Sequence, residues 1–186
     1  GKTQEAIALL KELTESTVRS ASMQERGNAL ILLERLGLLY RVAEQTEDAV
    51  AAFRRMAQVD SNAAPNAAAQ VIDTYRAAKD FVSAEREMKD ALAKYPEDRV
   101  LKSVAATLQS DLARHAEAEN LLKTLFDGKN DRAVHLALAQ AYDKAKNYAA
   151  MARALDEAEK LSESNEDKEP VLFLRGAMLE KQKRYD

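Results

Sequence analysis

Few residues of this 186-residue chain have the types and spacing that a catalytic or metal site requires. The chain opens with Gly1-Lys2-Thr3, the order that ends a phosphate-binding loop, where backbone amides and a lysine hold phosphate. The glycine and the strand that precede such a loop are not in this sequence, so we interpret the triplet as part of a turn between helices. The two histidines, His115 and His135, lie far apart and lack the Glu-flanked helical pair that binds zinc in metalloproteases. We predict a packing role for His135.

Acidic residues are plentiful, but their pattern is that of a solvated helix surface. The run EDKE (166–169) mixes acids with a base, whereas catalytic carboxylates need a dry pocket that shifts the pKa of one of them. The basic run EKQKR (180–184) lies next to acidic residues and is also typical of a solvent-facing surface. We therefore predict that the chain is not an enzyme and binds no metal ion or cofactor.

The composition is that of a folded, all-helical protein. Hydrophobic residues make up 46% of the chain and charged residues 32%, which is outside the range of disordered chains. Aromatic residues are only 5%, and the 5 glycines and 3 prolines are too few to separate many short strands. Alanine, the strongest helix former, abounds.

Charge and hydropathy limit the class of partner. The formal charge of -3 gives no general attraction to phosphate backbones or anionic lipid, so we expect no nucleic-acid partner. No apolar run approaches the roughly 18 residues that a spanning helix needs, so we expect no membrane insertion. With no cysteine, the sequence favours neither an oxidising nor a reducing compartment.

Apolar and small residues recur at a fixed period along the chain. The first complete unit has, at helical spacing, Leu33, Leu36, Gly37, Tyr40, Ala49, Phe53 and Met56. The same spacings return downstream, where Tyr75 and Ala84 each follow their counterparts by 35 residues and Ala118 follows Ala84 by 34. A fourth copy includes His135, and a fifth begins at Leu172. Self-similarity at such a period is the signature of a helical-repeat array.

This pattern resembles the tetratricopeptide repeat (TPR), a 34-residue helix-turn-helix unit. The resemblance implies an all-α fold, a right-handed α-solenoid of stacked antiparallel helix hairpins. Residues 1–186 are then a single array, in which 1–15 is the second helix of a preceding repeat, 22–63 is repeat 1 with an extended first helix, 64–97 is repeat 2, 98–131 is repeat 3, 132–168 is repeat 4, and 169–186 is the first helix of a truncated repeat 5. Ser22 and Glu25 have the spacing of a capping box that would start the extended helix. We expect helices at about 2–13 and 169–184 at the two ends, and at 46–59 and 81–94 between them.

A small residue in each first helix should let the second helix of the same unit approach closely. The residues at this position are Gly37, Ile72, Ala105, Ala139 and Gly176. Ile72 departs from the pattern, as does Met151 at the facing position of a second helix. We expect wider helix spacing or a shifted crossing angle at these two places.

The resemblance also implies a binding surface on the concave face that the first helices form. In TPR proteins partners contact fixed positions of each first helix, which correspond here to Leu38, Arg41, Asp73, Arg76, Lys102, Gln109, Leu136, Gln140, Asp143 and Phe173. One subclass of the family grips a C-terminal carboxylate with Lys, Asn and Arg. Glu34 and Leu38 stand where that subclass has its first Lys and Asn, so the sequence does not predict such a clamp.

We interpret the chain as a protein–protein interaction scaffold that binds a peptide segment or a partner protein in this groove. The alternative is a regulatory or substrate-docking array of a larger enzyme whose catalytic domain lies outside the chain. Base-by-base RNA binding would need a basic groove, and Asp73 and Asp143 argue against it. Since the array begins with a second helix and ends with a first helix, we also expect self-association through its open ends.

Overall fold

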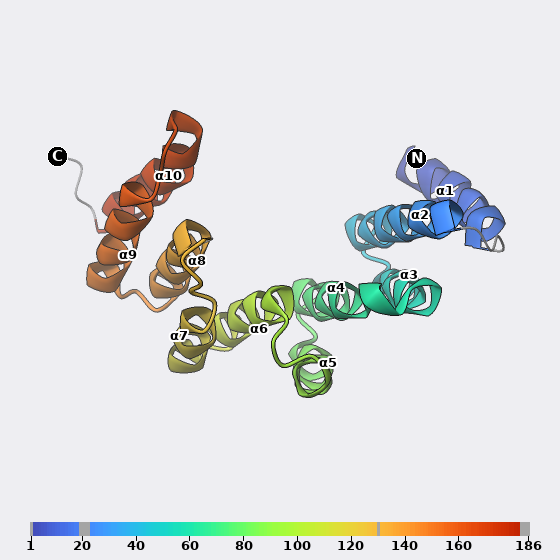
Figure 1. Cartoon of the computed structure of the whole chain (residues 1–186), viewed down its shortest axis with the longest axis horizontal. Helices are drawn as coiled ribbons and strands as arrows, with labels where there is room; N and C mark the ends of the chain where they lie inside the picture. Colours follow the sequence, from blue (N-terminus) through green and yellow to red (C-terminus); the bar gives the residue numbers. More distant parts are fainter. Residues whose placement is uncertain (1, 19–22, 130, 183–186) are drawn as a thin grey trace. The chain divides into compact units, whose positions relative to one another are not determined.

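A computed structural model of the chain describes residues 2–18, 23–129 and 131–182. All regular structure within these residues is helical, with no β-strand (Figure 1). The α-helices are α1 (Lys2–Val18), α2 (Met23–Val42), α3 (Thr46–Val59), α4 (Ala64–Ala77), α5 (Phe81–Lys94), α6 (Arg99–Asp111), α7 (His115–Lys123), α8 (Asp131–Lys144), α9 (Tyr148–Lys160) and α10 (Asn165–Lys181). The predicted all-α fold is confirmed. None of the described helices combines the length and the apolar character that crossing a membrane requires.

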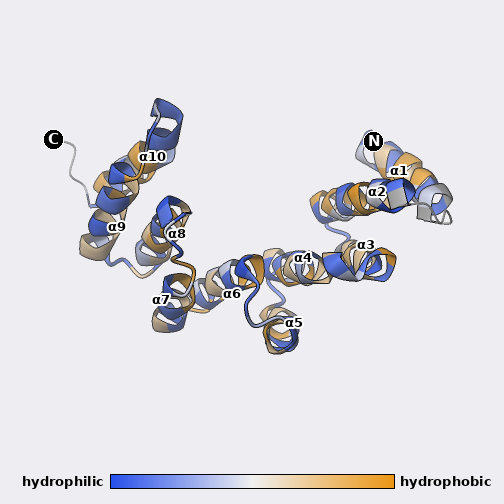
Figure 2. Cartoon of the chain, viewed as in Figure 1, coloured by the Kyte–Doolittle hydropathy of each residue, from blue (hydrophilic) through white to orange (hydrophobic). Residues whose placement is uncertain are grey.

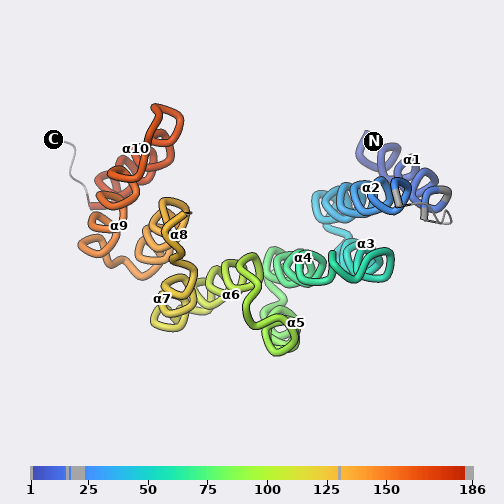
Figure 3. Tube along the Cα trace, in the orientation of Figure 1, coloured from blue at the N-terminus to red at the C-terminus, as the bar shows by residue number. Residues whose placement is uncertain are grey.

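The chain divides into two compact units, Gly1–Val104 and Ala105–Asp186, with the division inside α6. In each unit consecutive helices double back on one another, as the Cα trace shows (Figure 3). In the first unit α3 packs against both α2 and α4, and in the second α8 packs against both α9 and α10. Helix hairpins that stack in this way are the building blocks of an α-solenoid. The predicted division of residues 1–186 into numbered repeats stays a prediction.

Apolar side chains on one side of each helix hold the hairpins together. Hydrophobic and hydrophilic residues alternate along the helices, as expected of amphipathic elements (Figure 2). Phe53 and Ile72 are fully buried in the first unit, and Met151 and Leu155 in the second. Burying one such side chain contributes roughly 1.5–3 kcal/mol to the free energy of folding.

Gly37 lies directly against the ring of Phe53. A Cβ built at Gly37 would be 2.6 Å from both Cε1 and Cζ of that ring, closer than real side chains pack. The prediction that a small residue here lets α2 and α3 approach is therefore confirmed. At Gly176 the same prediction stays untested, because no second helix follows α10 in the described chain, and a Cβ at this exposed glycine would meet nothing within 4 Å. The wider spacing expected at Ile72 and Met151 stays a prediction.

Helix α10 begins at Asn165 and not, as predicted, at residue 169. Ser164 Oγ accepts a hydrogen bond from the Asp167 amide (3.1 Å), and Asp167 Oδ2 accepts one from the Ser164 amide (3.2 Å). The hydrogen bonds from Ser164 hold the pKa of the Asp167 carboxyl below its usual value. This capping box starts the helix before Pro170, which then lies inside it.

Helix α1 continues to Val18, past its predicted end at residue 13. The hydroxyls of Thr14 and Thr17 donate to the carbonyl oxygens of Leu10 and Leu13, at 2.6 and 2.8 Å. Each hydroxyl thus bonds the carbonyl four residues earlier, which satisfies the polar side chain inside the helix without stabilising the helix itself. At the start of α2 the predicted cap, Ser22, lies outside the described residues, although the helix does begin at Met23.

The turns inside the hairpins share one backbone conformation. In each turn the second-to-last residue before the next helix has a left-handed backbone without being glycine: Glu44 (φ 59°), Lys79 (φ 61°), Ala113 (φ 58°) and Lys146 (φ 55°). In each turn the next amide donates to the carbonyl five residues earlier, as from Asp80 to Tyr75 at 2.9 Å. This is the helix-ending pattern in which glycine is usually found. In the third unit Ala118 follows Leu108 by 10 residues, whereas in the first Ala49 follows Tyr40 by 9. The accepting carbonyl in this turn is that of Gln109, so the extra residue of the unit lies after Leu108.

We expect Lys79→Gly to raise the free energy of unfolding by about 0.5–1 kcal/mol, because glycine relieves the left-handed strain but adds freedom to the unfolded chain. The matched control is Lys89→Gly, on the exposed surface of α5, which should lower stability by about 1 kcal/mol. Urea unfolding measures both. Equal losses of stability in the two variants would show that the left-handed backbone at Lys79 is not strained.

Candidate functional site

One face of α2 in the first unit carries exposed apolar side chains. Ile31 and Leu38 are exposed, and Arg41 lies on the same helix face, since positions separated by three, four or seven residues share a face. Leu38 and Arg41 are two of the residues predicted to bind a partner. The structure brings them together at the C-terminal half of α2.

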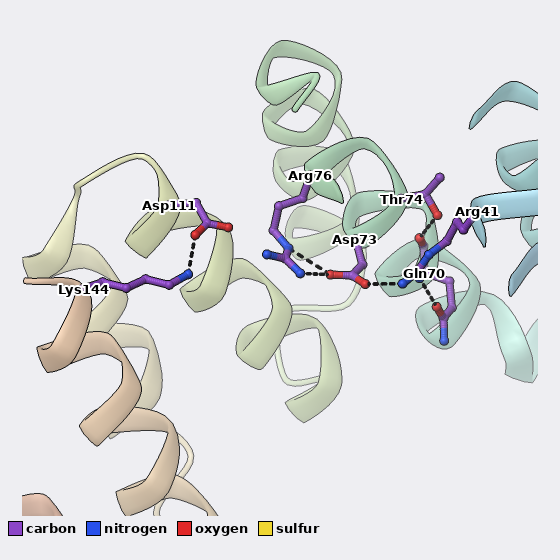
Figure 4. Close-up of polar contacts among 7 residues, drawn as sticks. All are labelled: Arg41, Gln70, Asp73, Thr74, Arg76, Asp111 and Lys144. Atoms are coloured by element: carbon purple, nitrogen blue, oxygen red, sulfur yellow. Dashed lines mark hydrogen bonds and ion pairs between the residues drawn. The ribbon is translucent and has the colours of Figure 1, made fainter. Parts of the chain in front are cut away.

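A polar cluster joins this end of α2 to α4 (Figure 4). Asp73 accepts from two guanidinium groups, Arg41 Nη2 at 3.0 Å and Arg76 Nη2 at 2.6 Å, and also from Arg76 Nε at 2.9 Å. Arg41 Nη1 also donates to Gln70 Oε1 at 3.1 Å. The side chains of all three charged residues are about a quarter exposed, at 25–26%. With two guanidiniums and one carboxylate, the three side chains of the Arg41–Asp73–Arg76 cluster together carry a net positive charge.

A cavity of about 480 Å³ lies beside the cluster, at the C-terminal ends of α2 and α4. Its lining residues are Arg41, Glu44, Thr46, Thr74, Ala77, Ala78 and Lys79. The Thr74 hydroxyl is already used, since it donates to the Gln70 carbonyl at 2.7 Å. The charged side chains of the lining are therefore what a polar ligand would meet.

Lys102 is the remaining predicted residue of the first unit. Its ammonium is 3.0 Å from Glu97 Oε2, and the lysine side chain is mostly buried, whereas the glutamate is almost fully exposed. Lys102 is thus less accessible to a partner than Arg41 or Arg76.

In the second unit one of the predicted residues on α8, Asp143, forms an ion pair. Asp143 Oδ2 is 2.5 Å from the ammonium of Lys181 on α10, and this bond raises the pKa of Lys181. The neighbouring residue, Lys144, pairs with Asp111 at the end of α6 (Figure 4). The other carboxylate oxygen of Asp143 is buried and has no hydrogen-bond partner.

The other predicted residues of this unit differ in accessibility. Gln109 Oε1 accepts from Arg114 at 3.3 Å. Gln140 is exposed, and Leu136 is half-buried against the core of the unit. Phe173 on α10 is among the most exposed large hydrophobic side chains of the described chain. Only Gln140 and Phe173 are therefore fully available to a partner here.

The sequence pattern did not predict that these polar residues bind one another. The resemblance assigns Arg41, Asp73, Arg76 and Asp143 to a partner-binding surface, yet each has an ion-pair partner within its own unit. The sequence did contain a signal for these ion pairs, because residues of opposite charge recur about one repeat apart. Such pairs are Arg41–Asp73, Arg54–Glu87, Asp111–Lys144, Arg132–Asp167 and Asp143–Lys181.

No cluster of three or more acidic or histidine side chains suited to a metal ion occurs among the described residues. The His135 ring packs against Phe126 with ring centroids 4.8 Å apart. This contact fits the predicted packing role of His135.

Comparison with known proteins supports the fold. A tetratricopeptide repeat protein from Parabacteroides merdae is similar over 99% of this chain and 67% of its own, with a TM-score of 0.72 and 17% identity. MamA from AMB-1 (84% of each chain, 15% identity) and yeast Tom70 (99% of this chain and 48% of that one, 13% identity) both give a TM-score of 0.49, at which the likeness adds nothing further. No protein-family model matches the sequence, and no curated protein matches it either. The chain is a TPR-like helical-repeat protein by its fold, an architecture typical of protein–protein interaction.

Proposed function

We propose that this chain is a non-catalytic scaffold that binds an extended or helical peptide segment of a partner protein along the exposed face of its first helices. The observation that carries the proposal is the pairing of exposed Ile31 and Leu38 on α2 with the net positive Arg41–Asp73–Arg76 cluster. Apolar anchors beside partly exposed charges are how helical scaffolds fix both the affinity and the register of a peptide.

The charge of the cluster defines the chemistry of the partner. A peptide with an apolar residue would place it on Leu38, and an acidic side chain a few residues away would meet the guanidiniums of Arg41 and Arg76. Charge-assisted hydrogen bonds from arginine to a carboxylate are shorter and stronger than neutral ones. Because Asp73 already orients both arginines, a bound carboxylate would need little side-chain reordering.

A peptide-display selection against the immobilised chain tests the proposal directly. We expect selected peptides to combine an apolar and an acidic residue, and Leu38→Asp to weaken their binding at least about tenfold. The matched control is Val82→Asp, an exposed aliphatic position on α5. Peptides that bind the Leu38 variant as tightly as the original chain would place the site elsewhere.

Charge reversal should also weaken a selected peptide. Arg76→Glu makes the cluster net negative, so we expect the Kd of an acidic peptide to rise at least about tenfold, with a smaller salt dependence. Asp143→Lys, which replaces a negative charge on α8 by a positive one, should not weaken an acidic peptide and is the control for charge reversal as such. Calorimetric titration gives the Kd, and circular dichroism checks that each variant is folded. Undiminished affinity of the Arg76→Glu variant would remove the cluster from the site.

A further inference from the structure

A second cavity, of about 230 Å³, lies between α3, α4 and α5 in the interior of the first unit. Its apolar wall consists of small side chains, those of Ala57, Ala64, Ala67, Ala68, Val71 and Ala91. α4 packs against both α3 and α5, and the cavity lies beside the N-terminal half of α4. Asp73 and Arg76 lie in the C-terminal half of the same helix, so this cavity is separate from the polar cluster.

Ala68 occupies a position that is bulky in other first helices of the chain. It stands four residues before Ile72, the residue of α4 that corresponds to Gly37. At the same position α2 has Leu33, α6 has Leu101 and α8 has His135. Leu33 and Leu101 are fully buried. An alanine in place of such a side chain leaves part of the space between the helices unfilled.

The second unit shows which side chains occupy the corresponding space. Ala57 follows the buried Ala49 by 8 residues, and Phe126 follows the buried Ala118 by the same number. The Phe126 and His135 rings contact each other, with centroids 4.8 Å apart and planes inclined by 57°. Phe126 is 38% exposed, so its ring closes this space from the solvent side. The second unit therefore has a pair of aromatic rings where the first unit has two alanine methyl groups.

We infer that the cavity between α3, α4 and α5 binds an aromatic side chain of a partner protein, which takes the place that Phe126 has in the second unit. Its size agrees with this occupant, because an apolar cavity of about 150 Å³ is enough to hold a benzene ring. The site goes beyond the peptide-binding face of α2, with which it shares no residue.

The mouth of the cavity favours an aromatic over an aliphatic side chain. Arg54 and Lys94 are exposed there; Arg54 Nη2 is 2.6 Å from Glu87 Oε1, and Lys94 Nζ is 5.3 Å from the centroid of the Tyr95 ring. Cations at this place complement the negative face of an entering ring. The Tyr95 ring, which also lines the cavity, offers the tilted or offset contact that aromatic pairs prefer. An aliphatic side chain would gain neither interaction.

Peptide tryptophan fluorescence tests the inference without background, because the chain contains no tryptophan. Random peptides with one fixed tryptophan are selected against the Leu38→Asp variant, in which the proposed α2 face is blocked, so that this test can fail independently of the proposed function. We expect the emission of selected peptides to shift to the blue on binding, and tryptophan-to-leucine replacement to raise the Kd at least about tenfold. Equally tight binding of the leucine peptide, or a selection that yields no binder, would overturn the inference.

Filling the cavity with side chains of the chain itself should prevent this binding. Ala57→Phe/Ala68→His copies the ring pair of the second unit, and Ala68→Leu restores the residue type of α2 and α6. Each should raise the Kd of a selected peptide at least about tenfold, with no fall in Tm. The matched control is Ala93→Leu, at an exposed alanine of α5, which should bind like the original chain. Undiminished affinity in both cavity variants would overturn the inference.

Titration of the unmodified chain with indole examines the cavity without any substitution. The alanine methyl resonances are followed by NMR. We expect saturable shifts at Ala57, Ala68 and Ala91, which line the cavity, and none at Ala93. Shifts spread evenly over exposed alanines, or no shift at the solubility limit of indole, would show that the cavity does not take an aromatic ring.

Discussion

Gly37→Leu should lower the free energy of unfolding by about 1–3 kcal/mol, because the new side chain has no room beside Phe53. Even a Cβ would lie 2.6 Å from the Phe53 ring, and that ring is fully buried and cannot move into solvent. The overpacking must therefore be relieved by separation of α2 from α3 or by strained rotamers. Thermal and urea unfolding measure the loss.

The chain provides a matched control for this prediction. Gly176 occupies the same repeat position in α10, but nothing lies within 4 Å of its Cβ position. Gly176→Leu should leave the stability of the monomer unchanged or raise it by up to about 1 kcal/mol, because glycine is a poor helix residue. Replacing Phe53 by leucine in the Gly37→Leu background should recover part of the loss, since the two side chains compete for one space. An equal effect of both glycine substitutions would show that the loss at Gly37 does not come from contact with Phe53.

The order of the helices could be predicted because small and bulky residues recur at fixed offsets in each repeat. Gly37 and Phe53 hold the same offsets as their counterparts in later units, and packing of facing helices demands small and bulky residues at those places. The predicted bounds of α3 and α5, at 46–59 and 81–94, agree with the structure. These helices are ended by turns whose polar residues are visible in the sequence.

Helix ends that depend on local hydrogen bonds were harder to predict. α10 starts early because Ser164 and Asp167 cap each other, whereas a polar stretch before Pro170 has the composition of a loop. α1 runs past its predicted end through Thr14 and Thr17, whose hydroxyls bond carbonyls of the same helix. Composition describes average preferences, and a single capping contact is enough to move a boundary by several residues.

The sequence predicted which residues belong to the candidate site, but it did not predict the ion pairs between them. The repeat register places Arg41, Asp73 and Arg76 on first helices, and the structure does bring these three together. That they bind one another depends on side-chain reach between neighbouring units, which a register does not specify. Their mutual pairing makes them a preformed cluster in place of separate unpaired charges, and the recognition of an acidic group that we propose depends on this pairing.

Leu155→Ala should be the most destabilising of these substitutions, lowering the free energy of unfolding of the second unit by about 2–5 kcal/mol through loss of buried surface and creation of a cavity. Leu155 is fully buried in a core that includes Leu138, Met151 and Val171. In repeat arrays each element is stabilised by its nearest neighbours, so the loss should concentrate in the unit that contains the cavity. Amide hydrogen exchange should then quicken strongly in α8, α9 and α10 and little in α2 to α5.

The exposed Leu161, just after α9, provides the control. Leu161→Ala removes the same side-chain atoms without opening a cavity, so its effect should stay within about 0.5 kcal/mol. The division between the units lies inside α6. Exchange of the α6 amides therefore shows how far along the chain the substitution lowers stability. Faster exchange confined to the part of α6 after Val104 would mean that the units unfold separately. Equal acceleration from α2 to α10 would mean that the whole described chain unfolds as one cooperative block, and that the division seen in the contacts has no thermodynamic counterpart.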